Sequence, residues 1–360
     1  MSTKKQSLSP DYAVHPGEIL EETLDAREIT KQELAARTGI TPKTISQIVN
    51  RKASISPEVA VALERSLGIS AETWTNLDTQ YRLHEARERD RERYESLGDW
   101  AAQFPLLELV KRHVLSQSRD RTLAAKELLD FFAVSDLDSW SAVYEKPVAL
   151  FRRSAVLQSS THAVAAWLRL AELEAHKVDT ARYNGRNFER ALRSIRTLTL
   201  EEPSLYGEKL RTLCAQSGVA VVFVPELPKC RTSGATRWIG RSKTMIALSL
   251  RYKSDDQFWF SFFHEAGHAV LHGRDRVFID IEEEAGDETE READQFARNR
   301  LLPKEAYEQF TSRGRFHRND IEEFASGIGI AAGIVIGALQ HDKLIEFGWH
   351  NELKRKLWVE

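Results

Sequence analysis

A five-residue segment, His264-Glu265-Ala266-Gly267-His268, places two imidazoles and a carboxylate within a strongly apolar stretch. Residues four apart lie on the same face of an α-helix, so both imidazoles can reach one metal ion. The surrounding phenylalanine, alanine and valine residues predict a buried helix, in which unpaired polar side chains are costly. We therefore predict that His264 and His268 bind Zn²⁺ and that Glu265 is the catalytic base for a metal-bound water.

A catalytic zinc site also needs a third protein ligand and one open position. Helical periodicity returns at 289–302, where apolar side chains recur on one face and Glu290 follows His268 by 22 residues (290 − 268). Glu290 lies at the edge of this face and is the predicted third ligand. Glu292 points away from the face and is the competing candidate.

Two further polar residues belong to the predicted site. Asp294 follows Glu290 by four residues, and we expect it to accept a hydrogen bond from a ligating histidine, which fixes the ring's tautomer. The alternative for Glu290 and Asp294 is that they are acids favoured near a helix start by the helix dipole. His272 lies four residues past His268 and is expected to be a polar wall of the site, with metal binding as the weaker alternative.

The sequence near the beginning of the chain predicts a helix-turn-helix. Two short helices fit Lys31–Arg37 and Pro42–Asn50, and Gly39 between them supplies the positive φ that a tight turn needs. Thr41 is placed to cap the second helix, and the helix begins with Pro42, a residue that suits the first turn. A plain helical packing module is the alternative.

Polar and cationic side chains of this motif are predicted to face DNA, because such groups bond to base edges and phosphates. Residues 1–80 hold 9 Lys+Arg and 11 Asp+Glu, a net charge of −2 (9 − 11), so only a local cluster of cations supports the prediction. The predicted DNA-binding residues are Gln32, Thr41, Lys43, Thr44, Gln47, Asn50 and Arg51.

Composition limits the remaining possibilities. The chain has 360 residues and a net charge of −3, so no global basic field indicates nucleic acid. The apolar runs are too short or too rich in glycine to span a bilayer, and the first residues lack the apolar core of a signal peptide. With only two cysteines a disulfide scaffold is excluded. We expect a cytoplasmic protein with no membrane partner.

The predicted fold class is multidomain and mainly α. Short β-branched or aromatic runs at 219–224, 236–239 and 245–250 predict strands after an otherwise helical half. The charged run Arg82–Glu95 is expected to be a solvated helix or linker, with a dimerising helix as the alternative. The predicted division is an all-α helix-turn-helix domain (1–80), a charged linker helix (81–98), a helical middle region (99–203), a small α+β domain (204–310) and a C-terminal helical extension (311–360).

Two stretches resemble known families. His15–Gly68 resembles the helix-turn-helix domain of HigA-type antitoxins and phage-repressor-like regulators, through HPGEIL and ISQIVNRKASISPEVAVALERSLG. Phe258–Gly273 (FWFSFFHEAGHAVLHG) with Glu290–Pro303 (EREADQFARNRLLP) resembles the ImmA/IrrE zinc metallopeptidases. The second resemblance implies a zincin-like domain, with three strands before the HExxH helix and Glu290 as a ligand. Asp294 stands where Asn is common in that family.

The resemblances imply a homodimer on a palindromic double-stranded DNA operator and a protein substrate such as a repressor or toxin. The expected function is a transcriptional regulator with a zinc endopeptidase domain, in which Glu265 assists attack by zinc-bound water on the partner. An edge strand at 236–239 or 245–250 is expected to hold the substrate extended. The alternative is a HigA-like antitoxin or regulator whose zincin domain is a sensor or interaction module without proteolysis.

Overall fold

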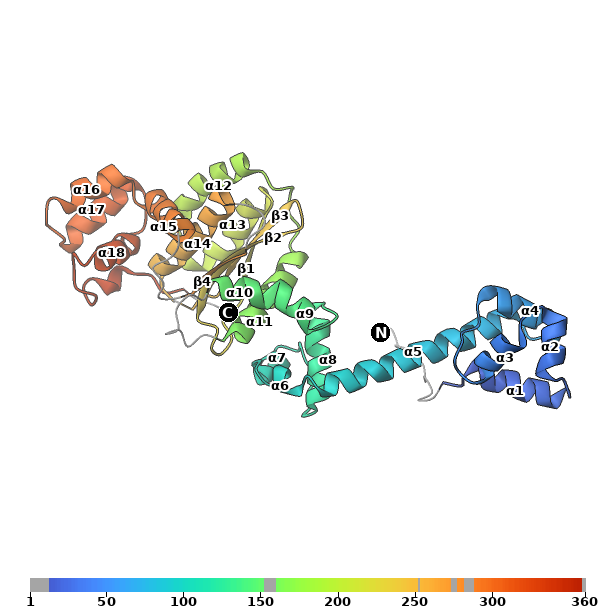
Figure 1. The fold of residues 1–360 in the computed structure, drawn as a ribbon. Coiled ribbons are helices and arrows are strands. Elements are labelled where there is room, and N and C mark those ends of the chain that lie inside the picture. The colour runs from blue at the N-terminus through green and yellow to red at the C-terminus, as the bar shows by residue number, and fades with distance from the viewer. Residues whose placement is uncertain (1–12, 152–159, 252, 273–276, 282–287, 358–360) are drawn as a thin grey trace. The chain divides into compact units, whose positions relative to one another are not determined.

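The computed structural model describes residues 13–151, 160–251, 253–272, 277–281 and 288–357. The chain forms two compact units, Met1–Gly98 and Asp99–Glu360, each with its own hydrophobic core (Figure 1). Helices dominate, and the strands form one small mixed sheet in the second unit, which confirms the predicted fold class. The five-segment domain division stays a prediction.

The first unit is helical throughout its described part. Side-chain oxygens of Thr30, Thr41, Ser56 and Ser70 each accept a hydrogen bond from an amide in the following first turn, which satisfies donors that a helix start leaves open. The helices are α1 (Pro16–Ala26), α2 (Lys31–Thr38), α3 (Pro42–Val49), α4 (Pro57–Leu67) and α5 (Ala71–Glu95).

The predicted turn between α2 and α3 is present. Gly39 ends α2 in the left-handed conformation with φ of 74°, and Thr41 caps α3 as predicted. Ile45, Ile48 and Val49 are buried in the core of this unit, so the opposite side of α3 is left toward solvent.

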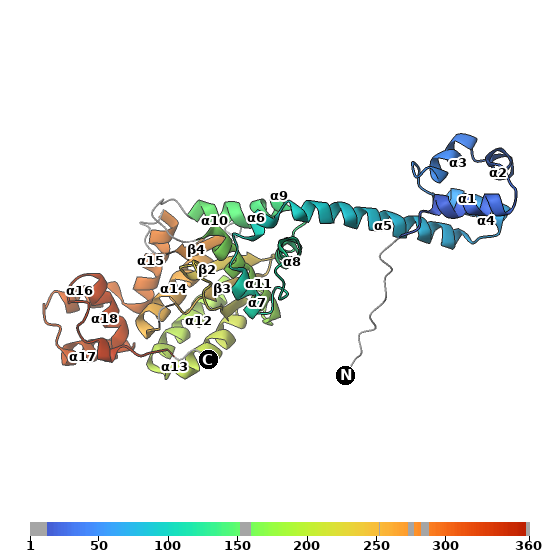
Figure 2. The same ribbon diagram turned by 90° about the horizontal axis from the view of Figure 1, so that it is seen from below.

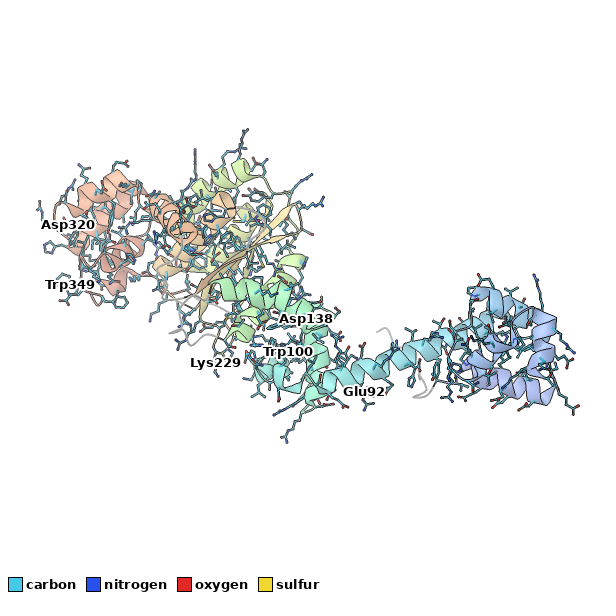
Figure 3. All side chains as sticks on the ribbon, viewed as in Figure 1. Glu92, Trp100, Asp138, Lys229, Asp320 and Trp349 are labelled. Carbon is cyan, nitrogen blue, oxygen red and sulfur yellow. The ribbon has the colours of Figure 1, made fainter. Side chains whose placement is uncertain are left out.

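The second half of α5 is an exposed helix, and the choice between a solvated linker and a dimerising helix stays a prediction. No side chain between Arg82 and Glu95 is buried, and all of these residues lie in the described part of the chain. Glu92, labelled in Figure 3, belongs to this exposed stretch. The hydrophobic effect contributes little here, because the helix buries its apolar side chains, such as Trp74, only near its start.

The start of α1 should make this unit sensitive to mild acid. His15 is 2% exposed, and its Nδ1 accepts the Gly17 amide hydrogen at 2.8 Å, with the Tyr81 ring edge-on against it. Burial, helped by the charge of Arg51, lowers the pKa of His15 below its ordinary value, so the folded unit favours the neutral ring. Protonation removes the capping acceptor.

We expect the unit to lose about 1 kcal/mol of stability as the pH falls through about 6.5 toward the lower pKa of the folded state, and to keep it above that range. The measurement is urea unfolding at pH 7.5 and 5.5, followed by NMR signals of residues 16–67. His15→Asn keeps a capping acceptor that does not titrate, so the variant should lose this pH dependence. An equal acid shift in both proteins would contradict the assignment.

The second unit surrounds a sheet with helices. Before the sheet come α6 (Gly98–Ala101, at the boundary between units), α7 (Leu106–Lys111), α8 (Arg121–Phe132), α9 (Leu137–Trp140), α10 (Lys146–Phe151), α11 (Thr161–Lys177), α12 (Gly185–Thr197) and α13 (Pro203–Ala215). A π-helical turn (Ser141–Glu145) joins α9 to α10, and a 3₁₀ turn (Leu198–Leu200) follows α12. Within and after the sheet come α14 (Asp255–Leu271), α15 (Glu288–Leu301), α16 (Lys304–Thr311), α17 (Arg318–Ile328), α18 (Ala332–His341) and a 3₁₀ turn at Asn351–Leu353.

The sheet has the strand order β1-β3-β2-β4, with β1 (Val219–Phe223), β2 (Thr232–Ile239), β3 (Lys243–Leu248) and β4 (Val277–Ile281). β1 and β3 are parallel, whereas β2 is antiparallel to both β3 and β4. The three predicted strands are confirmed, and β4 was not predicted.

The predicted edge strand is wrong. Both 236–239 and 245–250 fall on strands with a neighbour on each side, because β4 returns after α14 and pairs antiparallel with β2. In the described part of the chain the edges are β1 and β4, so only these strands can offer unpaired backbone groups to another chain.

Helices cover both faces of the sheet (Figures 1 and 2). α13 and α14 pack on one face, where Val219, Val221 and Ile246 share a core with Phe262 and Phe263 of α14. α11 packs against the other face, and its Trp167 indole donates a 2.8 Å hydrogen bond to the carbonyl of Val224. The helix carrying His264 is therefore fixed on the sheet by its apolar side.

Helices α16, α17 and α18 follow α15, and α18 packs against α14. Asp320 and Trp349, labelled in Figure 3, belong to this part of the chain. No single described helix has the length and apolar character needed to cross a membrane. The pair α17 and α18 reaches those values only when taken together, and it is bent by 113° at the break.

Candidate metal centre

Helix α14 carries the predicted motif as a buried element. The structure bounds it at Asp255–Leu271. His264 is 3%, Glu265 0% and His268 1% exposed. Because phenylalanines hold the apolar side of α14 on the sheet, the two histidines are directed to the side where α15 packs.

His264, His268 and Glu290 form a compact cluster. One ligand atom from each lies within 4.8 Å of the others. The two histidine Nε2 atoms are 3.1 Å apart, and Glu290 Oε2 lies 3.1 Å from that of His264 and 3.5 Å from that of His268. The helices approach closely at Gly267, where an added Cβ would come within 3.2 Å of Ala293 Cα. A side chain there would crowd Ala293 and Phe296 of α15, so the two helices pack closely because residue 267 is a glycine.

The protonation states suit a metal. Burial alone would raise the pKa of Glu290, but the imidazoles of His264 and His268 beside its carboxylate outweigh burial and hold the pKa at about 2. Burial lowers the pKa of His268, which favours its neutral ring. A deprotonated carboxylate and neutral imidazoles are the forms that bind Zn²⁺, and two nitrogens with one oxygen are donors that zinc accepts. The residues therefore fit the ion.

Asp294 lies where the sequence placed it. Its Oδ1 is 2.9 Å from His264 Nδ1, the ring nitrogen that faces away from the cluster. Since a carboxylate only accepts, the His264 Nδ1–H donates to Asp294, which leaves Nε2 with its lone pair toward Glu290 and His268.

The two competing candidates, Glu292 and His272, contact each other instead of joining the cluster. Glu292 Oε2 is 3.0 Å from His272 Nε2, and His272 Nδ1 is 2.9 Å from His268 Nδ1. The structure therefore distinguishes Glu290 from Glu292. Glu290 contacts the Nε2 atoms of His264 and His268, whereas Glu292 contacts His272.

Glu265 is not among the clustered ligand atoms, and its carboxylate lies against β2. The Thr236 hydroxyl is 2.7 Å from Oε2 and 2.9 Å from the Glu265 carbonyl oxygen. A Cβ added at Gly234 would come within 2.5 Å of Glu265 Oε1, so this position has to remain free of a side chain. Thr236 and Gly234 thus fix the Glu265 carboxylate from the sheet side, and no local pattern in the sequence indicates this.

The sequence also gave no indication of Phe278 on β4. Its ring stacks on His268 with centroids 4.3 Å apart and planes within 15°. The contact brings β4 beside the cluster of His264, His268 and Glu290. The strand is short and precedes an acidic stretch, part of which lies outside the described residues, so periodicity gives only a weak signal for it.

The predicted DNA-binding residues gather on and beside α3. Lys43 is exposed, Gln47 is half-buried, and the hydroxyls of Thr41 and Thr44 are 2.9 Å apart at the helix start. Gln32 is exposed on α2. Asn50 caps the end of α3, and its side-chain amide donates to the Ser46 carbonyl.

Arg51 departs from the sequence prediction. Helix α3 ends at Val49, one residue earlier than predicted, and Arg51 follows in the left-handed conformation with φ of 62°. Its guanidinium forms an ion pair with Glu18 of α1. Arg51 is therefore not on the face of α3, and a phosphate has to compete with Glu18 for it.

Comparisons with known proteins assign both regions to families. Residues 20–74 match the helix-turn-helix family, and residues 214–332 match the IrrE N-terminal-like domain, a family classed with the peptidases. The chain is a helix-turn-helix regulator with an IrrE N-terminal-like domain. Both resemblances stated from the sequence are thereby confirmed.

Three similar proteins each match about a fifth to a quarter of this chain. The uncharacterized HTH-type transcriptional regulator YddM of Escherichia coli is 37% identical over 71 residues, which is 20% of this chain and 76% of that protein. Virulence-associated protein I of Dichelobacter nodosus is 37% identical over 77 residues, 21% of this chain and 71% of that protein. Antitoxin HigA of Pseudomonas aeruginosa, solved with the higBA promoter, is 32% identical over 24% of this chain and 94% of that one, with a TM-score of 0.22.

Proposed function

We propose that the chain binds a palindromic operator as a homodimer and cleaves a partner protein, a repressor or toxin, at a zinc site formed by His264, His268 and Glu290. The observation that supports the site most directly is the 4.8 Å cluster of three donor atoms on α14 and α15. Membership in the IrrE N-terminal-like family supports peptidase chemistry.

Zn²⁺ bound by these residues would polarise a scissile carbonyl and lower the pKa of a water. Asp294 holds His264 in the tautomer that directs Nε2 to the ion. Glu265 would take the proton of the attacking water and pass it to the leaving amine. Its carboxylate is held by the Thr236 hydroxyl at 2.7 Å, so little reorientation is needed before proton transfer.

β4 is the strand best placed to bind the substrate. It is an edge of the sheet among the described strands, and its Phe278 ring contacts His268. An extended peptide that pairs with β4 through its backbone would run past the metal cluster. This assigns to β4 the role that the sequence had placed on 236–239 or 245–250.

Turnover is tested by incubating the zinc-loaded chain with proteins encoded beside its gene, comparing wild type with Glu265→Gln. A fragment formed by wild type alone supports the peptidase. A regulator whose zincin domain serves only as a sensor or interaction module would yield no fragment with either protein.

Operator binding makes a separate prediction. Gln47 lies on α3 away from the buried isoleucines, and a glutamine amide can bond to a base edge. Gln47→Ala should therefore weaken operator binding by about 1–3 kcal/mol at one base pair and relax specificity there. Lys43→Ala should weaken binding to all sequences and reduce the salt slope by about 1, because a lysine neutralises one phosphate. The measurements are selection of bound fragments and titrations at several salt concentrations.

Glu72→Ala, on the exposed start of α5, serves as the control and should change neither quantity. The proposed operator binding is refuted if selection returns no palindromic site, or if Lys43→Ala binds DNA with the wild-type affinity and salt dependence.

A further inference from the structure

Three carboxylates of α15 lie near the two histidines of α14, and each contacts a different nitrogen or set of nitrogens. Glu290 reaches the Nε2 atoms of both histidines. Asp294 contacts the outer nitrogen of His264 directly. Glu292 contacts neither, but binds His272 at 3.0 Å. The outer nitrogen of His268 is thus reached by a carboxylate only through a second imidazole.

Glu292, His272 and His268 form a series of hydrogen bonds, and the donor and acceptor roles within it follow from the carboxylate at one end. Glu292 accepts only, so His272 Nε2–H donates to it and His272 Nδ1 is left as an acceptor. That acceptor lies 2.9 Å from His268 Nδ1, which therefore carries the hydrogen. His268 Nε2 is then the nitrogen with a free lone pair, and it is the one that faces His264 and Glu290.

The position of His272 excludes it from the same ion as His268 Nε2. It contacts the opposite nitrogen of that ring, so the imidazole of His268 stands between His272 and the cluster. Phe278 stacks on His268 and also lies against His272, with centroids 4.3 and 5.1 Å away, which limits rotation of both rings.

We propose that His272 and Glu292 are positioning residues that fix the tautomer and orientation of His268, as Asp294 does for His264. The inference rests on the proposed zinc site and deepens it, because it assigns a role to two residues that bind no metal. The spacing fits the arrangement: His264 and His268 lie four residues apart on one face of α14, and His272 follows four residues later as the residue that ends the helix, with its ring centroid 5.0 Å from that of His268.

The test is zinc affinity, measured by competition between the metal-free full chain and a chromophoric chelator. His272→Ala should bind zinc about 10–100-fold more weakly, the usual effect of losing an outer partner of a ligating histidine. His272→Asn places an amide oxygen near the lost Nδ1 acceptor and should recover most of the affinity. A role in packing alone would not be rescued by a smaller polar side chain.

A substitution of Glu292 tests the same role without disturbing a buried position, because the Glu292 side chain is 53% exposed. Glu292→Ala should weaken zinc binding in the same direction but less, and adding it to His272→Ala should change nothing more, since both act through His268. Glu288→Ala, an exposed acid at the start of α15, is the matched control and should bind zinc like wild type.

The outcomes separate the two proposals. A wild-type chain that binds no zinc overturns the proposed zinc site. A wild-type chain that binds zinc, together with His272→Ala and Glu292→Ala variants that bind it equally well, overturns the positioning role alone. A loss in Glu292→Ala as large as that in Glu290→Ala would make Glu292 a ligand, which also overturns it.

Discussion

Glu265→Gln will lower the rate of partner cleavage by about 10²–10⁴-fold, the usual contribution of a general base. Glutamine keeps the size of the side chain, and its amide oxygen can still accept the Thr236 hydroxyl hydrogen. It does not take up the proton of an attacking water. Because Glu265 is not among the three clustered ligands, zinc content should stay at the wild-type level.

The measurement compares wild type and Glu265→Gln for fragment formation in vitro and for derepression of the target promoter in cells. Operator affinity should be equal in both, because the helix-turn-helix belongs to the other compact unit. Glu305→Gln makes the same chemical change at an exposed position on α16 and should cleave normally.

Equal derepression by wild type and Glu265→Gln, with no fragment from either, would show regulation without proteolysis. Loss of derepression in the Gln variant alone is the result we expect. A normal cleavage rate in Glu265→Gln would remove Glu265 from the base role even if the site proves to be a peptidase.

His264→Ala will abolish stoichiometric zinc binding. Wild type should carry about one Zn²⁺ per chain, held through two nitrogens and one oxygen. Loss of an outer hydrogen-bond partner alone weakens a zinc site about 10–100-fold, so loss of a ligand should exceed about 100-fold. The variant also removes one of the two imidazoles that keep the pKa of Glu290 near 2.

Elemental analysis of protein purified without chelator gives the stoichiometry, and chelator competition gives the affinity. His317→Ala is the matched control, since His317 is exposed at the start of α17. Melting curves with and without zinc are needed for both variants, because metal binding contributes to folding. The zinc site is refuted if wild type holds no metal and takes up none from solution.

The sequence predicted the local parts of both regions well. The i, i+4 spacing of His264 and His268 is a property of any α-helix, so it holds before any tertiary contact is known. The turn at Gly39 and the cap at Thr41 likewise depend on a few neighbouring residues, and the structure confirms both. Both family resemblances rest on such short segments.

The errors and omissions all involve contacts between distant residues. The edge strand was misplaced because β4 pairs with β2 only after the chain has passed through α14. Arg51 stays a predicted DNA contact, and its ion pair with Glu18, 33 residues earlier, leaves no trace in local periodicity.

By itself, the sequence determined which helix carries the histidines, that Glu290 or Glu292 could join them, and which helix of the first unit presents polar groups. Only the tertiary structure decided between Glu290 and Glu292 as neighbours of the Nε2 atoms, and only it placed Thr236 on Glu265, 29 residues away. The reason is physical: helical periodicity fixes the direction of a side chain on its own helix, whereas the packing of α15 and the sheet on α14 fixes which atoms it meets.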